Sequence, residues 1–203
     1  MTKRNTPHVQ TFGCRLNIWE SEVLRDQAGA AGLSDAIIFN TCAVTAEAEK
    51  QARQAIRKAR RDHPDAKIIV TGCAAQIAPE TWTRMPEVTQ VIGNHDKLKP
   101  ESWEKLATSN APLLLVSDIM EVRETASHLV DSFHEHTRAF LQIQQGCDHR
   151  CTFCVIPYGR GNNRSAPASR LVDAAKNLVV NGCKELVLTG VDITSWGRDL
   201  PER

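Results

Sequence analysis

Residues 36–73, AIIFNTCAVTAEAEKQARQAIRKARRDHPDAKIIVTGC, contain a complete strand–helix–strand unit. The unit begins with the apolar run 36–39, which is typical of a strand buried on both faces. Thr45 is placed to cap a helix that reaches about Asp62, with acidic residues near its start and basic residues near its end, as the helix dipole favours. A second apolar run follows at residues 67–70. Two buried strands joined by a helix predict a parallel sheet.

The same alternation continues on both sides of this unit. Further strands are expected at residues 8–12, 88–92 and, as an edge strand, 112–118. Further helices are expected at residues 18–31 and 96–107. We therefore expect an α/β fold, with a flavodoxin-like parallel sheet covered by helices, over residues 1–110.

A second domain is expected over residues 137–203, after a polar linker over residues 111–136. Its expected elements are a strand at residues 139–144, a polar loop from Gly146 to about Ser165, a helix between Pro167 and Gly182, and a strand at residues 185–188. This amounts to one and a half strand–helix units, which bury too little surface to form a core. We therefore expect the chain to be a piece of a longer protein.

The composition is that of a globular protein, with 41% hydrophobic and 24% charged residues among 203. A formal net charge of +1 argues neither for nor against a nucleic-acid partner. The first residues lack the apolar stretch of a secretory signal, and no apolar run is long enough to span a bilayer. We expect a cytoplasmic protein, in which an odd count of seven cysteines favours metal ligands over a disulfide framework.

Cys147, Cys151 and Cys154 form a C-x3-C-x2-C loop directly after an expected strand. Three thiolates so close together can bind three irons of one [4Fe–4S] cluster, which leaves the fourth iron open to a chelating substrate. A zinc site completed by His149 is the alternative, as are three ordinary thiols. We favour the cluster, because His149 would have to fold back between its own neighbours.

Cys14, Cys42 and Cys73 are far apart in the sequence, yet each follows an expected strand. The carboxyl ends of parallel strands share one edge of a sheet, and neighbouring strands lie about 5 Å apart. Adjacent strands would therefore bring these thiols together as a second metal site. The alternative is that all three are small buried side chains, as free cysteines often are.

The Cys-x3-Cys-x-aromatic-Cys pattern of residues 147–154 resembles the signature of radical S-adenosylmethionine (SAM) enzymes. That resemblance implies a (β/α) barrel, a 5′-deoxyadenosyl radical as the reagent, and Phe153 lying against the adenine of the cofactor. Gly190 follows the second strand of this domain, where its backbone is expected to approach the methionine end of the cofactor; a simple turn is the equal alternative.

The segments around the upstream cysteines, TFGCRLN (11–17), NTCAV (40–44) and TGCAAQ (71–76), resemble the N-terminal domain of radical SAM methylthiotransferases. The resemblance implies that Cys14, Cys42 and Cys73 hold an auxiliary [4Fe–4S] cluster that takes part in sulfur insertion. It implies two [4Fe–4S] clusters and SAM as cofactors, and an external electron donor. The family also carries the rest of the barrel and an RNA-binding domain, so this chain alone is expected to be inactive.

The strings GCRLNIWES (13–21) and LTGVDITSWG (188–197) are most similar to the branch that converts N6-threonylcarbamoyladenosine 37 of tRNA to its 2-methylthio derivative. A methylthiotransferase acting on a ribosomal-protein aspartate, a non-catalytic iron–sulfur electron-transfer protein and a zinc-binding structural module are the alternatives. Arg160 and Arg164 follow the cysteine loop and are candidates to bind a substrate phosphate or the cofactor carboxylate, unless the loop is simply solvated. Cys183 is expected to be structural.

Overall fold

The computed structural model describes residues 6–123 and 138–201. The first domain contains a five-stranded parallel sheet in which the strands follow chain order: β1 (His8–Thr11), β2 (Ile37–Thr41), β3 (Ile68–Gly72), β4 (Gln90–Ile92) and β5 (Leu114–Leu115). The expected α/β class and parallel sheet are confirmed. The strand order differs from the flavodoxin-like order, in which the second strand lies outside the first. Here β1 is the edge strand.

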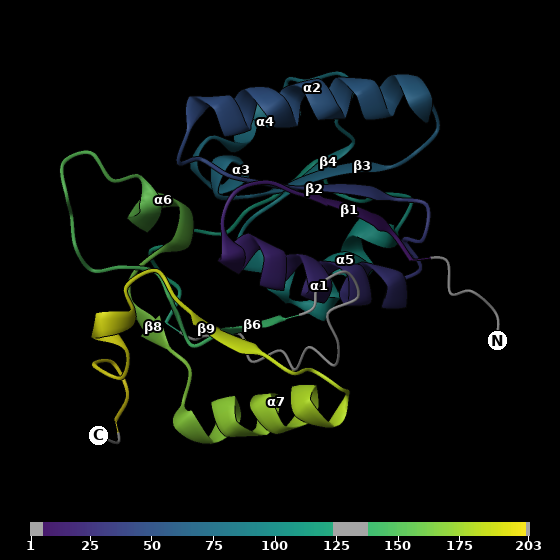
Figure 1. Cartoon of the computed structure of the whole chain (residues 1–203). Coiled ribbons are helices and arrows are strands. Elements are labelled where there is room, and N and C mark those ends of the chain that lie inside the picture. Colours follow the sequence, from purple (N-terminus) through teal and green to yellow (C-terminus); the bar gives the residue numbers. More distant parts are fainter. Residues whose placement is uncertain (1–5, 124–137, 202–203) are drawn as a thin grey trace.

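Helices cover both faces of this sheet (Figure 1). One face carries α1 (Arg15–Ala30) and α5 (Pro100–Ala107), which follows the short 3-10 helix η1 (Asp96–Leu98). The other face carries α2 (Ala46–Asp62), α3 (Cys73–Ile77) and α4 (Pro79–Thr83). As expected, Thr45 caps α2: its Oγ1 accepts a hydrogen bond from the backbone N–H of Ala48 at 3.2 Å.

The two faces of the sheet have separate apolar cores because side chains alternate along each strand. Ile37 and Phe39 of β2 pack with Ala52 and Ile56 of α2 on one face. Ile38 between them packs on the other face, in the cluster that contains residues of α1 and α5. Every residue of β2 and β3 is buried, which explains why their sequences are continuous apolar runs rather than alternating ones.

The second domain is smaller. Its parallel pair β6 (Ala139–Gln142) and β9 (Leu186–Thr189) lies against α7 (Ala168–Val180) (Figure 1). The long polar loop is only partly irregular, because it contains α6 (Ile156–Arg160) and the strand β8 (Arg164–Ser165). β8 pairs with β7 (Gln144–Gln145), so the single strand expected at residues 139–144 is interrupted at Ile143. The 3-10 helix η2 (Ile193–Ser195) follows β9.

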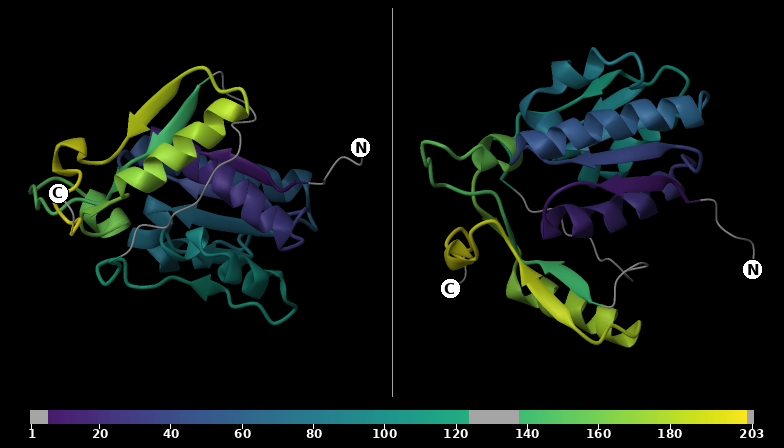
Figure 2. Two further views of the ribbon diagram at one scale, coloured as in Figure 1. Left: turned by 90° about the horizontal axis from the view of Figure 1, so that it is seen from below. Right: turned by 45° about the horizontal axis from the view of Figure 1, so that its top comes forward.

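The two domains are in direct contact through α1. Trp19 and Val23 of α1 form an apolar cluster with Leu98 and with Phe140 of β6. Figure 2 shows β6, β9 and α7 as a separate layer beside α1. Most of the expected linker, residues 124–136, lies outside the described residues. Among the described residues, no helix has the length and apolarity needed to cross a membrane.

Candidate metal centres

The structure places Cys14, Cys42 and Cys73 at one edge of the first domain, since β1, β2 and β3 are neighbours in the sheet. Cys42 and Cys73 are 6% and 4% exposed, whereas Cys14 is exposed. Gly13 lies directly against Cys42: its φ is +92°, and a Cβ built on it would be 2.6 Å from Cys42 Sγ. The turn that carries Cys14 therefore needs glycine, both for its backbone angle and for this close approach.

Asn17 joins the loops of Cys14 and Cys42. Its buried side-chain amide donates to the carbonyl of Phe12 at 2.7 Å and to the carbonyl of Thr41 at 3.1 Å. Both carbonyls lie just before the two cysteines in the chain. The amide of Asn17 therefore holds the ends of β1 and β2 in a fixed relation, and with them the two thiols.

Cys73 is approached by the second domain. Asn94 Nδ2 donates to Cys73 Sγ at 3.5 Å and to the carbonyl of Gly159 at 2.5 Å. A Cβ built on Gly159 would be 3.0 Å from the Cβ of Cys73, so α6 packs closely over this cysteine. The N-terminal cysteine site (Cys14, Cys42 and Cys73) is thus bordered by residues of both domains.

Burial raises the pKa of the Cys42 thiol, and electrostatic repulsion from Cys73 and Cys14 adds to this effect. The same repulsion disfavours three free thiolates at the neighbouring ends of β1, β2 and β3. Metal binding would remove both obstacles, because it displaces the thiol proton and neutralises the thiolate charge.

A buried group of charges lies beside this site. Glu20 of α1 accepts from Lys97 Nζ at 2.7 Å, from Arg160 Nη1 at 2.7 Å and from Gln145 Nε2 at 3.1 Å. The side chains of Glu20 and Lys97 have no exposed surface. Burial alone would raise the pKa of Glu20, but Arg160 and Lys97 outweigh it and hold the pKa below its ordinary value. Glu20 is therefore a carboxylate shared by both domains.

Cys147, Cys151 and Cys154 lie in the loop between β7 and α6. Cys151 is exposed and the other two are half-buried. The loop is fixed at its base, where the N–H of Cys147 donates to the carbonyl of Gly161 at 3.0 Å, and it turns where the N–H of Cys154 donates to the carbonyl of Cys151 at 3.0 Å. This donor set fits a [4Fe–4S] cluster, because three accessible thiols come from one ordered loop.

His149 lies beside Cys147 and Asp192, and the described residues show no group that joins it to all three cysteines of the loop. Donor atoms of Cys147, His149 and Asp192 all lie within 4.8 Å of one another, and His149 Nε2 is 3.3 Å from Asp192 Oδ2. Asp192, which follows β9, lies across the loop from the ring. A zinc site would therefore use these three residues, rather than His149 with the three cysteines.

The two residues expected to bind the cofactor lie near this loop. Phe153 is 90% exposed, which leaves its ring available to a ligand. Gly190 follows β9, and a Cβ built on it would be 2.9 Å from Gln144 Oε1. That oxygen accepts the N–H groups of Val191 and Asp192, each at 2.8 Å. Gly190 is therefore required for packing against Gln144, and its role toward a cofactor stays a prediction.

Arg160 and Arg164 are not placed to bind a phosphate or a carboxylate of a ligand, because they are 1% and 3% exposed. Arg160 is bound to Glu20, and Arg164 donates to the carbonyl of Arg160 at 2.8 Å. Cys183 lies apart, with its thiol 3.2 Å from the carbonyl of Glu185.

Four residues of the N-terminal site were missed by sequence reasoning: Asn17, Glu20, Asn94 and Lys97. One feature of the sequence indicated that Glu20 has buried partners. Glu20 stands in α1 beside the core residues Trp19 and Val23, where an unpaired carboxylate would be costly. Nothing in the sequence showed where its partners lie.

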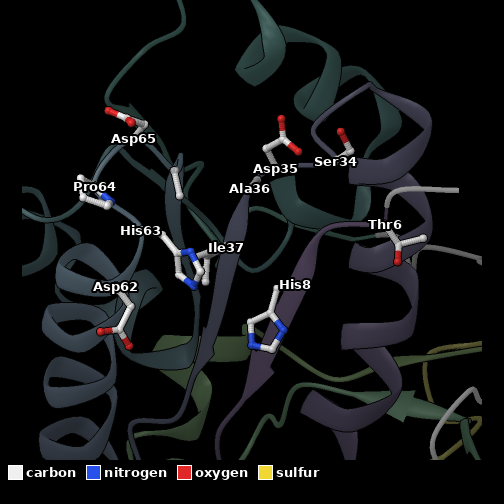
Figure 3. A pocket seen from close by; sticks show the side chains of 11 residues that line it. Thr6, His8, Ser34, Asp35, Ala36, Ile37, Asp62, His63, Pro64 and Asp65 are labelled. Carbon is white, nitrogen blue, oxygen red and sulfur yellow. The ribbon is translucent and has the colours of Figure 1, made fainter. Parts of the chain in front are cut away.

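A hollow of about 690 Å³ lies at the opposite edge of the sheet (Figure 3). It is lined by residues at the starts of β1 and β2 and before β3, including His8, Asp35 and His63. Ligands of open parallel sheets bind at the carboxyl ends of the strands, where the cysteines are. The hollow is therefore separate from both cysteine groups.

Two family models match the chain. Residues 6–93 match the Uncharacterized protein family UPF0004, and residues 141–201 match the Radical SAM superfamily. The first part of the chain therefore resembles a UPF0004 domain and the last part a radical SAM domain. Membership of the superfamily implies SAM and a [4Fe–4S] cluster as cofactors.

Curated relatives match almost the whole chain. Threonylcarbamoyladenosine tRNA methylthiotransferase MtaB of Rickettsia prowazekii is 55% identical over 193 residues, which cover 95% of this chain and 45% of the relative. The protein of the same name from Bacillus subtilis is 37% identical, and the match covers 97% of this chain and 46% of the relative. The tRNA-2-methylthio-N(6)-dimethylallyladenosine synthase of Cereibacter sphaeroides is 31% identical, and the match covers 98% of this chain and 48% of the relative. The chain spans slightly under half the length of these relatives.

Replacing Glu20 by Gln is expected to lower the free energy of unfolding by about 3–5 kcal/mol, because it leaves two buried cations without a carboxylate. The matched control is Glu80→Gln on α4, where an exposed pair with Arg84 is worth less than about 1 kcal/mol. Urea unfolding at neutral pH measures both values. Equal effects of the two variants would contradict the buried salt bridge.

The difference in stability between wild type and Glu20→Gln is expected to depend on pH in one direction. The pKa of Glu20 lies below 4.5 in the folded protein, so its contribution is complete above pH 4.5 and is lost as the pH falls through the folded value. The gap in stability between wild type and Glu20→Gln is therefore expected to be constant above that pH and to narrow below it. Urea unfolding at several pH values measures this change.

Proposed function

We propose that the complete protein is a radical SAM methylthiotransferase that converts N6-threonylcarbamoyladenosine of tRNA to its 2-methylthio derivative with two [4Fe–4S] clusters. The observation that carries this proposal is the presence of two separate cysteine triplets in one chain. One triplet lies on a single loop of the radical SAM domain. The other is gathered from three adjacent strand ends of the UPF0004 domain.

Cys147, Cys151 and Cys154 would hold the cluster that binds SAM. When bound, this cluster supplies one electron to the sulfonium of SAM. The surrounding residues orient the site: Gln144 fixes the segment after β9 through two backbone N–H groups, and its amide donates to Asn163 Oδ1 at 2.7 Å. Phe153 would cover the adenine and Gly190 would adjoin the methionine end.

Cys14, Cys42 and Cys73 would hold the auxiliary cluster. Two of these thiols are buried and one is exposed, so a cluster here would be shielded on the protein side and open on the side of Cys14. This asymmetry suits a cluster that exchanges sulfur with a substrate rather than one that only transfers electrons. An external reductant is needed for the reaction, and the cytoplasm supplies both that reductant and tRNA.

The choice of substrate rests on the relatives, several of which carry the threonylcarbamoyladenosine name. The sequence identity to the Rickettsia prowazekii protein is 55%, whereas the identity to the dimethylallyladenosine synthase is 31%. This difference favours the threonylcarbamoyl substrate over the dimethylallyl one. A ribosomal-protein aspartate is the remaining alternative substrate.

Metal analysis tests the two sites. After anaerobic reconstitution, the wild-type protein is expected to hold about eight irons with equal acid-labile sulfide, as two [4Fe–4S] clusters require. Replacing Cys147, Cys151 and Cys154 by Ala should leave about four irons, and replacing Cys14, Cys42 and Cys73 should also leave about four. Cys183→Ala is the control and should change nothing. If the protein instead binds zinc rather than iron, and loses the zinc when Asp192 is replaced by Ala, the site is a structural metal module.

Product analysis tests the reaction. The complete protein, incubated anaerobically with SAM, a reductant and tRNA that carries N6-threonylcarbamoyladenosine, is expected to form the 2-methylthio nucleoside, detected by mass spectrometry. The Cys147/Cys151/Cys154 variant should form neither this product nor 5′-deoxyadenosine. The Cys14/Cys42/Cys73 variant should still release 5′-deoxyadenosine without methylthiolation. Product only on dimethylallyladenosine-containing tRNA would overturn the assigned substrate.

A further inference from the structure

The buried charges around Glu20 do not balance. Lys97 and Arg160 both form their salt bridges with Glu20, at 2.7 Å each. All three side chains are at most 1% exposed. One carboxylate thus faces two cations in a region that water does not reach, and an uncompensated buried charge costs several kcal/mol. A further negative charge next to this group would therefore stabilise it.

The groups that face the surplus charge are cysteines of the N-terminal site. Arg160 Nη2 donates to Asn17 Oδ1 at 2.6 Å, and Cys14 Sγ lies 4.0 Å from the same oxygen. Gly159, next to Arg160, packs against Cys73. Burial disfavours the charged form of Arg160, but ionised Cys73 and Cys14, as in a metal-loaded site, together with Glu20 outweigh it and raise its pKa.

We propose that Arg160, a residue of the radical SAM domain, supplies the counter-charge of the N-terminal cysteine site and raises the reduction potential of the cluster held there. This inference rests on the auxiliary cluster proposed above. Three thiolates make the loaded site anionic, and reduction by one electron makes it more so without breaking a bond. A fixed positive charge beside the site stabilises the reduced form more than the oxidised form. Arg160 acts here as a positioning residue, not as a catalytic one.

The experiment uses the complete protein with Cys147, Cys151 and Cys154 replaced by Ala, so that only the N-terminal cluster contributes to the signal. Its potential is measured by titration with dithionite, followed by the electron paramagnetic resonance of the reduced cluster. Arg160→Met is the test variant. It leaves Glu20 and Lys97 as a balanced buried pair, so the fold is expected to persist.

Arg160→Met is expected to reduce the equilibrium constant for reduction at least tenfold, which is a shift of about 59 mV to lower potential for a one-electron couple. Arg160→Lys keeps the charge and should restore most of the parent value. Arg164→Met is the matched control. Arg164 is also a buried cation, but its electrostatic partners are Arg160 and Asp199 rather than cysteines, so its removal should leave the potential unchanged.

The outcomes separate this inference from the proposed function. A parent protein that binds no iron overturns the auxiliary cluster, and the role of Arg160 with it. A parent that binds about four irons, with the same potential in Arg160→Met, overturns the role of Arg160 alone. Equal shifts in Arg160→Met and Arg160→Lys, or in Arg164→Met, would show that packing rather than charge sets the potential, and would also overturn it.

Discussion

The arrangement of the two domains depends on the contacts made by the buried carboxylate of Glu20. This carboxylate receives Lys97 from the first domain and Arg160 and Gln145 from the second. Opening this contact would remove the buried hydrogen bonds from Arg160 and Gln145 to the carboxylate, so the contact is costly to open. The apolar cluster of Trp19 and Phe140 joins the same two domains through α1 and adds buried surface to the contact.

This contact also shapes the metal sites. Arg160 ends α6, and α6 follows the loop that carries Cys147, Cys151 and Cys154. The segment that holds one cysteine triplet therefore continues directly into the residues that border the other. The two triplets are therefore joined by a short, hydrogen-bonded segment.

Much of this could be predicted from the sequence, for physical reasons that also explain the failures. Residues 36–73 combine apolar runs, a cap and a dipole-matched helix, so their elements were predictable. The proximity of Cys14, Cys42 and Cys73 could be predicted from the parallel pairing of the strands. The order of the strands could not be predicted, because the buried apolar runs of β2 and β3 are alike in sequence. Helices of five residues, α3 and α6, are too short to show a period. Arg160 lies 140 residues from Glu20, and no local pattern links them.

Six cysteines are proposed to bind metal, whereas Cys183 is not. Alkylation by iodoacetamide, mapped by mass spectrometry in metal-free and iron-loaded protein, tests this proposal most directly. Cys14 and Cys151 are exposed and should react in the metal-free protein. Both should be protected after iron loading, while Cys183 reacts equally in the two states. Continued labelling of Cys14 or Cys151 in the iron-loaded protein would contradict the account.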